Sequence, residues 1–258
     1  VKLFLAKPPA TSLTRNDLTP MQRFAYDQII DDGQQIVYVS GKAGTGKTTV
    51  ALIACNNELK DRVQIGASTA KAASNFNGPT VHSMFGWSFK QPTDSLARHS
   101  DRKIEELRAF YSGVDVFVID EINAMSADQL ALVHETMNRI FNDGRRELPF
   151  GGKKMIFLGD PAQLRPVLGS AIYDNDVHHQ STGKPGRGRG MRGSQKSSRT
   201  YKGQTLYRKY LLPNSIVLKT SKRSAGLLQD ICDRLRDGKQ TAADLDRLTF
   251  LRRKFQDA

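Results

Sequence analysis

Short apolar runs of strand length alternate along the chain with segments in which apolar residues recur at helical spacing. The strand-like runs cover residues 36–40, 62–67, 114–121, 154–158 and 215–219. The helical segments cover residues 49–55, 102–107, 127–141 and 226–236. This alternation is typical of an α/β fold with a doubly wound, mostly parallel sheet. Ligands of such folds bind beyond the carboxyl ends of the strands, so polar residues at those ends are the candidates for a site.

The first strand-like run leads into a glycine-rich segment that fits the phosphate-loop pattern G-x-x-x-x-G-K-[ST] at every fixed position. The segment consists of Gly41, Lys42, Ala43, Gly44, Thr45, Gly46, Lys47 and Thr48, followed by Thr49. Its backbone N–H groups would hold phosphate oxygens, Lys47 would reach the β- and γ-phosphates, and the Thr48 hydroxyl would bind Mg²⁺. A chance glycine-rich turn is the alternative, and the flanking strand and helix disfavour it. The pattern predicts a nucleoside triphosphate site.

Two later strand ends carry side chains that suit phosphate chemistry. Asp120 and Glu121 end the run at 114–121. Asp120 is a candidate for Mg²⁺ binding, and Glu121 is a candidate base that orients the attacking water. The run at 154–158 continues into Gly-Asp-Pro, a sharp turn that would place Gln163 near the γ-phosphate if the sheet is parallel.

Gln22 has two possible roles that the residues alone leave open. Thr19, Pro20 and Gln22 together form a capping box with proline at the first helical position. Alternatively, the Gln22 amide, a donor and acceptor together, reads adenine beside the phosphate loop. The later motifs favour the adenine contact.

The segment after the second strand-like run is a candidate single-strand-binding surface. Thr69 and Thr80 offer hydroxyl groups for phosphates, and His82 with neighbouring aromatic rings could stack on bases. A histidine buried in the core is the alternative for His82, and taken alone it is the preferred one.

Charge points to a polyanionic partner. The formal net charge is +13, and residues 181–203 contain seven basic residues and no acidic one. These residues are Lys184, Arg187, Arg189, Arg192, Lys196, Arg199 and Lys202. We expect a basic mobile loop that follows a nucleic-acid backbone, with Arg187, Arg189 and Arg192 as DNA contacts; a solvated insertion is the alternative.

Composition narrows the class of protein further. The 38% hydrophobic content can form a core, and no apolar run approaches the roughly 18 residues of a membrane span. Cys55 and Cys232 lie far apart without metal-ligand spacing, which suits reduced thiols in an intracellular compartment. That compartment is the nucleus or mitochondrion of a eukaryote, or otherwise the cytoplasm. The polar residues 88–112 are expected to form an insertion or a small subdomain.

Taken together, the motifs resemble those of superfamily-one DNA helicases of the PIF type, a RecD-like family with RecA-like domains. The resemblance rests on Leu18–Gln22, Gly41–Thr49, Thr69–Trp87, Val118–Ile122, Phe157–Val167 and Leu218–Leu248. It implies ATP and Mg²⁺ as cofactors, single-stranded and forked duplex DNA as partners, and 5′-to-3′ unwinding in replication, repair or recombination. No obligate protein partner is evident. It also implies that Gln22 reads adenine, that Gln163 and Arg223 sense the γ-phosphate, and that Thr69, Thr80 and His82 lie along single-stranded DNA.

The resemblance also suggests a domain plan and two departures. Residues 1–16 would be a lead-in, residues 17–212 the first RecA-like domain, and residues 213–258 the truncated start of a second. Asn123 replaces the usual Ser and Arg165 the commoner Pro, which puts coupling in doubt more than binding. An ATP-binding, nucleic-acid-binding scaffold without turnover is the alternative function. A clamp-loader-like switch is disfavoured by the segments at 80–83 and 159–163.

Overall fold

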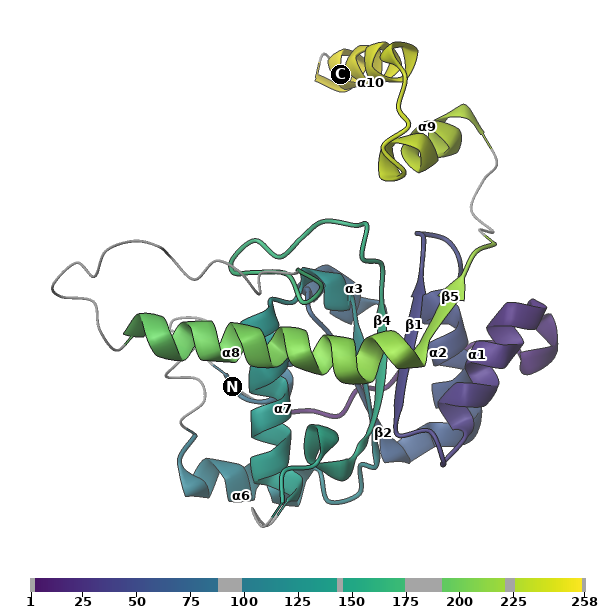
Figure 1. Cartoon of the computed structure of the whole chain (residues 1–258). Coiled ribbons are helices and arrows are strands. Elements are labelled where there is room, and N and C mark those ends of the chain that lie inside the picture. The colour runs from purple at the N-terminus through teal and green to yellow at the C-terminus, as the bar shows by residue number, and fades with distance from the viewer. Residues whose placement is uncertain (1–2, 88–98, 143–145, 175–191, 221–225, 257–258) are drawn as a thin grey trace, which may run out of the picture.

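The computed structural model describes residues 3–87, 99–142, 146–174, 192–220 and 226–256. Its centre is a five-stranded sheet in the order β2-β3-β4-β1-β5, in which every neighbouring pair is parallel (Figure 1). The strands are β1 (Ile36–Gly41), β2 (Val63–Ala67), β3 (Val116–Asp120), β4 (Lys154–Gly159) and β5 (Ser215–Leu218). The predicted α/β class with a parallel sheet is confirmed.

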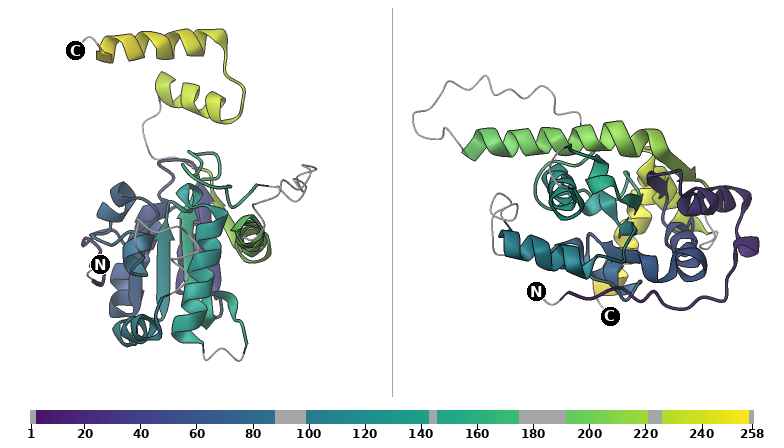
Figure 2. Two further views of the ribbon diagram at one scale, coloured as in Figure 1. Left: turned by 90° about the vertical axis from the view of Figure 1, so that its left-hand side faces the viewer. Right: turned by 90° about the horizontal axis from the view of Figure 1, so that it is seen from below.

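Helices cover both faces of this sheet (Figure 2). One face carries α1 (Pro20–Ile30) and α2 (Lys47–Ala54), and the other carries α6 (Asp101–Phe110), α7 (Ala127–Phe141) and α8 (Arg192–Leu206). Short helices α3 (Ala70–Ser74) and α4 (Val81–Met84) follow β2. Helices α9 (Leu227–Arg236) and α10 (Ala242–Gln256) come after β5.

Alternation along the strands explains the two layers. In β1, Ile36 and Tyr38 join the core beneath α6 and α7, whereas Val37 and Val39 join the core beneath α1 and α2. Strands β3 and β4 divide their apolar residues in the same way. Because both faces are buried, these strands read as continuous apolar runs, which is typical of parallel sheets.

Helix α7 begins and ends at the residues that the sequence predicts, 127 and 141. Ser126 caps its first turn in a capping box with Gln129, and Leu130, Val133 and Met137 are buried at helical spacing. In the described residues, no helix combines the length and apolarity that crossing a membrane requires.

The structure corrects the predicted domain boundary at residue 213. Residues 215–218 form β5, which pairs with β1 from Tyr38↔Ser215 to Gly41↔Leu218. This strand therefore belongs to the first sheet. The sequence pattern identifies a strand here but carries no information about its partner, which lies far away in the chain.

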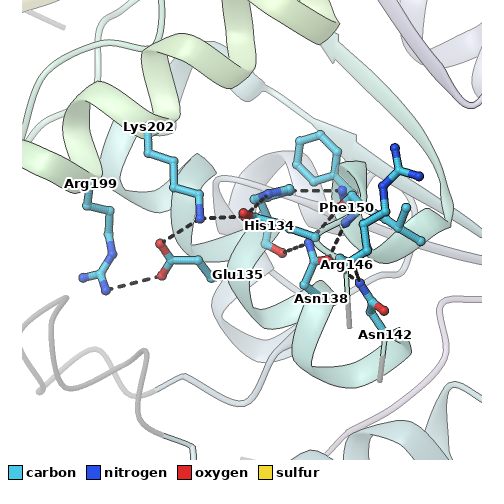
Figure 3. Close-up of polar contacts among 10 residues, drawn as sticks. His134, Glu135, Asn138, Asn142, Arg146, Phe150, Arg199 and Lys202 are labelled. Carbon is cyan, nitrogen blue, oxygen red and sulfur yellow. Dashed lines mark hydrogen bonds and ion pairs between the residues drawn. The ribbon is translucent and has the colours of Figure 1, made fainter. Parts of the chain in front are cut away.

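The basic segment 181–203 is also corrected in part, because residues 192–203 lie in helix α8 rather than in a loop. Arg199 Nη2 lies 3.3 Å from Glu135 Oε2, and Lys202 Nζ lies 2.7 Å from Glu147 Oε1 (Figure 3). Gly203 lets α8 approach α7 closely, because a Cβ atom there would lie 1.8 Å from the Ala127 carbonyl oxygen. Part of the basic charge thus neutralises acidic residues of the same domain. Residues 181–191 lie outside the described residues.

The segment 88–112, expected to be an insertion, is described only from residue 99. Its described part includes α6, which buries Ile104 and Leu107 in the core beneath α7. That helix is amphipathic, so its apolar side packs on the sheet while its charged side faces solvent.

Candidate functional site

The phosphate loop connects β1 to α2 through backbone conformations that favour glycine. Gly44 and Gly46 have φ angles of +81° and +84°, in the left-handed region. A Cβ atom on Gly46 would also lie 2.5 Å from Gln22 Nε2. Helix α2 begins directly after Gly46, at Lys47, so its free N–H groups face the loop. This geometry is the anion-binding arrangement that the sequence predicts.

Lys47 lies inside the loop with 8% of its surface exposed. Its Nζ donates hydrogen bonds to the carbonyl oxygens of Gly41 (2.6 Å) and Lys42 (3.1 Å). Burial lowers the pKa of Lys47, while Asp160, Asp120 and Glu121 oppose that shift. The ammonium group is therefore near enough to these three carboxylates for their charges to act on it.

Thr48 and Asp120 come together from α2 and β3. The Thr48 hydroxyl donates a hydrogen bond of 3.1 Å to Asp120 Oδ2. Asp120 is 3% exposed, and burial raises its pKa to about 6. A hydroxyl beside a carboxylate fits Mg²⁺, which takes oxygen ligands and usually keeps water and substrate phosphates as the others. The described residues contain no group of three His, Cys, Asp or Glu side chains that could hold a metal ion.

Glu121 has an unusual backbone. Its φ and ψ angles are +54° and +45°, a left-handed conformation that costs a residue with a Cβ about 1–3 kcal/mol. Its N–H donates a 2.7 Å hydrogen bond to Asp120 Oδ1. This left-handed residue links the end of β3 to a short helical turn, Ile122–Ala124.

The turn after β4 brings a third strand end to the site. Asp160 is 1% exposed, and its Oδ1 accepts a hydrogen bond of 3.1 Å from the Ala162 N–H. The Gln163 N–H donates to the Asp160 carbonyl oxygen at 3.0 Å. Asn123 Oδ1 accepts from the Asp160 N–H at 3.3 Å, which ties this turn to the segment after Glu121. The turn therefore lies at the carboxyl edge of the sheet, and the role of Gln163 at the γ-phosphate stays a prediction.

Asn123 and Arg165, the two residues that differ from the family pattern, both form contacts in or beside this turn. The Asn123 amide also donates to the Leu164 carbonyl oxygen at 3.5 Å. Arg165 forms an ion pair with Asp174, whose carboxylate also accepts from the Ala171 N–H at 2.9 Å. Sequence reasoning treated Asn123 and Arg165 as a source of doubt, and the structure gives both a role in ordering the turn.

Gln22 uses its amide for both a cap and a loop contact. Its Oε1 accepts from the Thr19 N–H at 2.9 Å, and its Nε2 donates to the Thr45 carbonyl oxygen at 2.8 Å. The capping box is confirmed. Beside it lies a cavity of about 340 Å³ that Leu13, Leu18, Gln22 and Thr49 help to line. A larger cavity of about 530 Å³ lies around Asp115 and Lys153, and none of the predicted site residues lines it.

Comparison with known proteins identifies the family. Residues 17–182, more than half of the chain, match the model of the PIF1-like helicase family. The chain belongs to the PIF1-like helicases. The PIF1 helicase of Emericella nidulans is 33% identical over 154 residues, which cover 57% of this chain and 20% of that protein. The Pif1 helicase of Bdellovibrio bacteriovorus is 30% identical over 158 residues, covering 61% of this chain and 35% of that protein.

Solved structures show the same fold. The crystal structure of Candida albicans Pif1 aligns with a TM-score of 0.66 and 21% identity, covering 91% of this chain and 47% of that one. Bacteroides Pif1 bound to single-stranded DNA aligns with a TM-score of 0.63 and 24% identity, covering 91% and 49%. This PIF1-like chain thus has the expected RecA-like fold and spans about half the length of those two structures.

Three of the residues predicted to contact DNA in this PIF1-like helicase form contacts within the chain itself. Thr69 and Thr80 cap α3 and α4, accepting from the N–H groups of Ala72 (3.2 Å) and Ser83 (3.3 Å). The ring of His82 packs edge-on against Trp87 at 5.8 Å, and burial lowers the pKa of His82. All three residues follow β2 at the carboxyl edge of the sheet. Their roles along DNA stay predictions.

Four predicted arginines cannot be placed in the site. Arg187, Arg189 and Arg223 lie outside the described residues, and Arg192 is described only through the backbone of α8. Sequence reasoning missed Asp160, although Gly-Asp-Pro marked its turn, and it missed Arg236, which contacts Asp160. No local signal identifies Arg236, because the contact depends on where α9 packs.

Proposed function

We propose that this chain is the nucleotide-hydrolysing domain of an ATP-dependent DNA helicase. The observation that carries the proposal is the 3.1 Å contact between the Thr48 hydroxyl and Asp120, which joins the phosphate loop to the carboxylates that end β3. Membership of the PIF1-like family supports the helicase class. The cavity beside Gln22 offers room for the adenine end of ATP.

In this proposal each side chain has one task in the reaction. Lys47 neutralises charge on the β- and γ-phosphates, while Thr48 and Asp120 would hold Mg²⁺. When bound there, Mg²⁺ would supply positive charge that neutralises the charge developing on the phosphates. Glu121 orients a water molecule and accepts its proton as the oxygen attacks the γ-phosphorus and the bond to the β-phosphate oxygen breaks. Gln163, held by the turn after β4, and Arg223 sense the γ-phosphate.

The DNA-directed part of the function follows from relatives and charge. One solved relative is a Bacteroides Pif1 bound to single-stranded DNA, and another structure describes two coordinating Pif1 helicases at forked duplex DNA. For this chain we propose movement along single-stranded DNA in the 5′-to-3′ direction, with unwinding in replication, repair or recombination. The net charge of +13 supports a polyanionic partner.

Steady-state hydrolysis of MgATP by residues 1–258, with and without a single-stranded oligonucleotide, tests this function. We expect hydrolysis that rises when DNA is added and that requires Mg²⁺. Tight binding of ATP and DNA without turnover would instead support the scaffold alternative. A fluorescent ATP analogue, titrated in parallel, separates loss of binding from loss of chemistry.

A further inference from the structure

Helix α9 reaches the nucleotide site through two ion pairs of opposite polarity. Lys42, within the phosphate loop, places its Nζ 3.0 Å from Asp233 Oδ1. Arg236 donates to the carboxylate of Asp160, in the turn after β4. Asp233 and Arg236 are three residues apart and thus share one face of α9. Figure 1 shows α9 on the side of the carboxyl ends of β1 and β4.

The Arg236 contact differs from an ordinary surface ion pair. The Asp160 carboxylate is 1% exposed, and the Arg236 side chain is 24% exposed. A carboxylate removed from water needs a cation or several hydrogen-bond donors to remain charged. Arg236 supplies that cation from a helix to which the sequence pattern assigns no site residue.

Asp160 is also the residue that shapes the turn carrying Gln163. Its side chain accepts from the Ala162 N–H, and its carbonyl oxygen accepts from the Gln163 N–H. Burial lowers the pKa of Lys47, and the positive charge of Arg236 contributes to the same lowering, so Arg236 lies near enough to the phosphate loop for the two charges to interact. The contact therefore lies between α9 and the group expected to sense the γ-phosphate.

We propose that Arg236 is a positioning residue for ATP hydrolysis: it holds Asp160, and through it the turn that presents Gln163, while Asp233 holds the phosphate loop. Helix α9 thereby couples its own docking to the nucleotide site. This inference rests on the proposed ATPase function. The γ-phosphate would add negative charge beside Lys47, whose charge interacts with that of Arg236, so we expect ATP to stabilise docked α9 more than ADP does.

Kinetics of three variants test the positioning role. Arg236→Gln should lower kcat for ATP at least tenfold while KM changes less than twofold, because phosphate binding by the loop is retained. Arg236→Lys should recover part of kcat. Lys239→Gln is the matched control, since it removes one exposed positive charge three residues away and should leave kcat unchanged. Equal kcat for Arg236→Gln and Lys239→Gln would overturn the proposal.

A double-variant comparison separates this role from general damage. Asp160→Asn should lower kcat as Arg236→Gln does, and the combined variant should be no slower than the slower single variant. If the two substitutions lowered kcat independently, so that their factors multiplied in the combined variant, the proposed contact would be contradicted.

Hydrogen exchange tests docking without relying on turnover. In Arg236→Gln, the amides of residues 227–236 and 160–165 should exchange faster than in the unsubstituted protein and in Lys239→Gln. A non-hydrolysable ATP analogue should slow exchange of residues 227–236 more than ADP does, and equal protection by both would overturn the coupling. If the unsubstituted protein binds ATP without hydrolysing it, the proposed function fails, whereas these exchange differences still decide whether Arg236 docks α9.

Discussion

Glu121 occupies a backbone conformation that residues with a Cβ atom rarely adopt. The surrounding structure holds it there through the Asp120–Glu121 hydrogen bond and through Ile122 and Asn123, which are buried. Strain that the fold sustains at a carboxylate is typical of functional sites. The cost makes sense if the direction of the Glu121 side chain matters to the reaction.

Glu121→Gln should leave ATP binding nearly unchanged and lower hydrolysis by about 10²–10⁴-fold, the usual contribution of a general base. Glutamine keeps the size of the side chain and loses the charge that orients water. Fluorescent-ATP titration and steady-state hydrolysis measure the two effects separately. Hydrolysis that survives this change would reduce Glu121 to a carboxylate at a strand end.

Lys47→Ala should weaken ATP affinity as well as turnover, because the cation of Lys47 serves both the bound nucleotide and the transferred phosphoryl group. We expect a loss of about 10³-fold or more in rate, comparable with other cations that contact the γ-phosphate. The measurements are the same titration and hydrolysis assay. Lys60→Ala removes an exposed lysine beyond α2 and is the control. Unchanged binding in Lys47→Ala would refute the assignment of the phosphate loop.

His134 should make stability depend on pH. Its Nε2 pairs with Glu147 at 2.7 Å, its Nδ1 accepts from the Phe150 N–H at 3.0 Å, and burial lowers its pKa (Figure 3). A lowered folded-state pKa means that the unfolded chain takes up the proton first. The contribution of neutral His134 to the free energy of unfolding is therefore complete above the unfolded-state pKa of about 6.5. It is lost as the pH falls toward and through the folded-state pKa.

Urea unfolding at pH 7.5 and pH 5.5 measures this dependence. The free energy of unfolding should be lower at pH 5.5 than at pH 7.5. The difference should be smaller in His134→Gln, which is less stable at pH 7.5 but cannot take up the proton. An equal pH dependence in both proteins would show that His134 does not contribute.

At the scale of elements, the contact between α7 and α8 depends on one glycine. Gly203→Ala would force a Cβ atom against the Ala127 carbonyl group, so α8 must move away from α7. We expect a loss of roughly 1–3 kcal/mol in the free energy of unfolding, the usual range for overpacking. Gly113→Ala is the matched control, since its Cβ would meet nothing within 4 Å. Chemical denaturation of both variants measures the difference, and equal stability would contradict the close approach.

The elements that the sequence predicts best are those with strong local patterns. Helix α7 combines a cap with apolar residues at helical spacing, and the phosphate loop has fixed residues at fixed spacing, so both could be located without the structure. The sequence pattern does not predict helix α8, because its first residues are basic and rich in glycine and serine. Its helical form is supported by Glu135 and Glu147, which are distant in sequence.

The candidate site likewise contains residues that local sequence patterns predict and one residue that they do not. Lys47, Thr48, Asp120 and Gln163 follow from strand ends and motif spacing, and the structure places all four at one edge of the sheet. Arg236 could not be predicted, because its role exists only once α9 packs against Asp160. Long-range packing of this kind leaves no periodicity in the sequence.

At the scale of the whole molecule, the net charge of +13 is distributed unevenly. Arg199 and Lys202 already pair with acidic residues of α7 and the segment after it. Arg187 and Arg189 are therefore better candidates for DNA contacts. Replacing both with Gln should reduce the slope of log affinity for single-stranded DNA against log salt by about 0.7 for each phosphate that the protein no longer neutralises. Fluorescence anisotropy at several salt concentrations measures this slope.

The control for this experiment is Arg199→Gln with Lys202→Gln, which removes the same charge from paired positions. We expect that variant to lose stability while its salt slope stays closer to that of the unsubstituted protein. A larger change of slope in the control than in the Arg187 and Arg189 variant would reassign the contact surface to α8.

The strand order has a consequence for how this protein is made. Strand β1, which presents the phosphate loop, takes its two neighbours from residues 154–159 and 215–218. At about 5–20 residues per second, the ribosome needs on the order of ten seconds or more after finishing β1 before β5 has emerged. Throughout that time Tyr38 and Val39 lack at least one of the two strands that flank them in the finished sheet. Because unpaired strand edges can pair with other chains, we expect the nascent chain to be most prone to aggregation while its future nucleotide site is still half built.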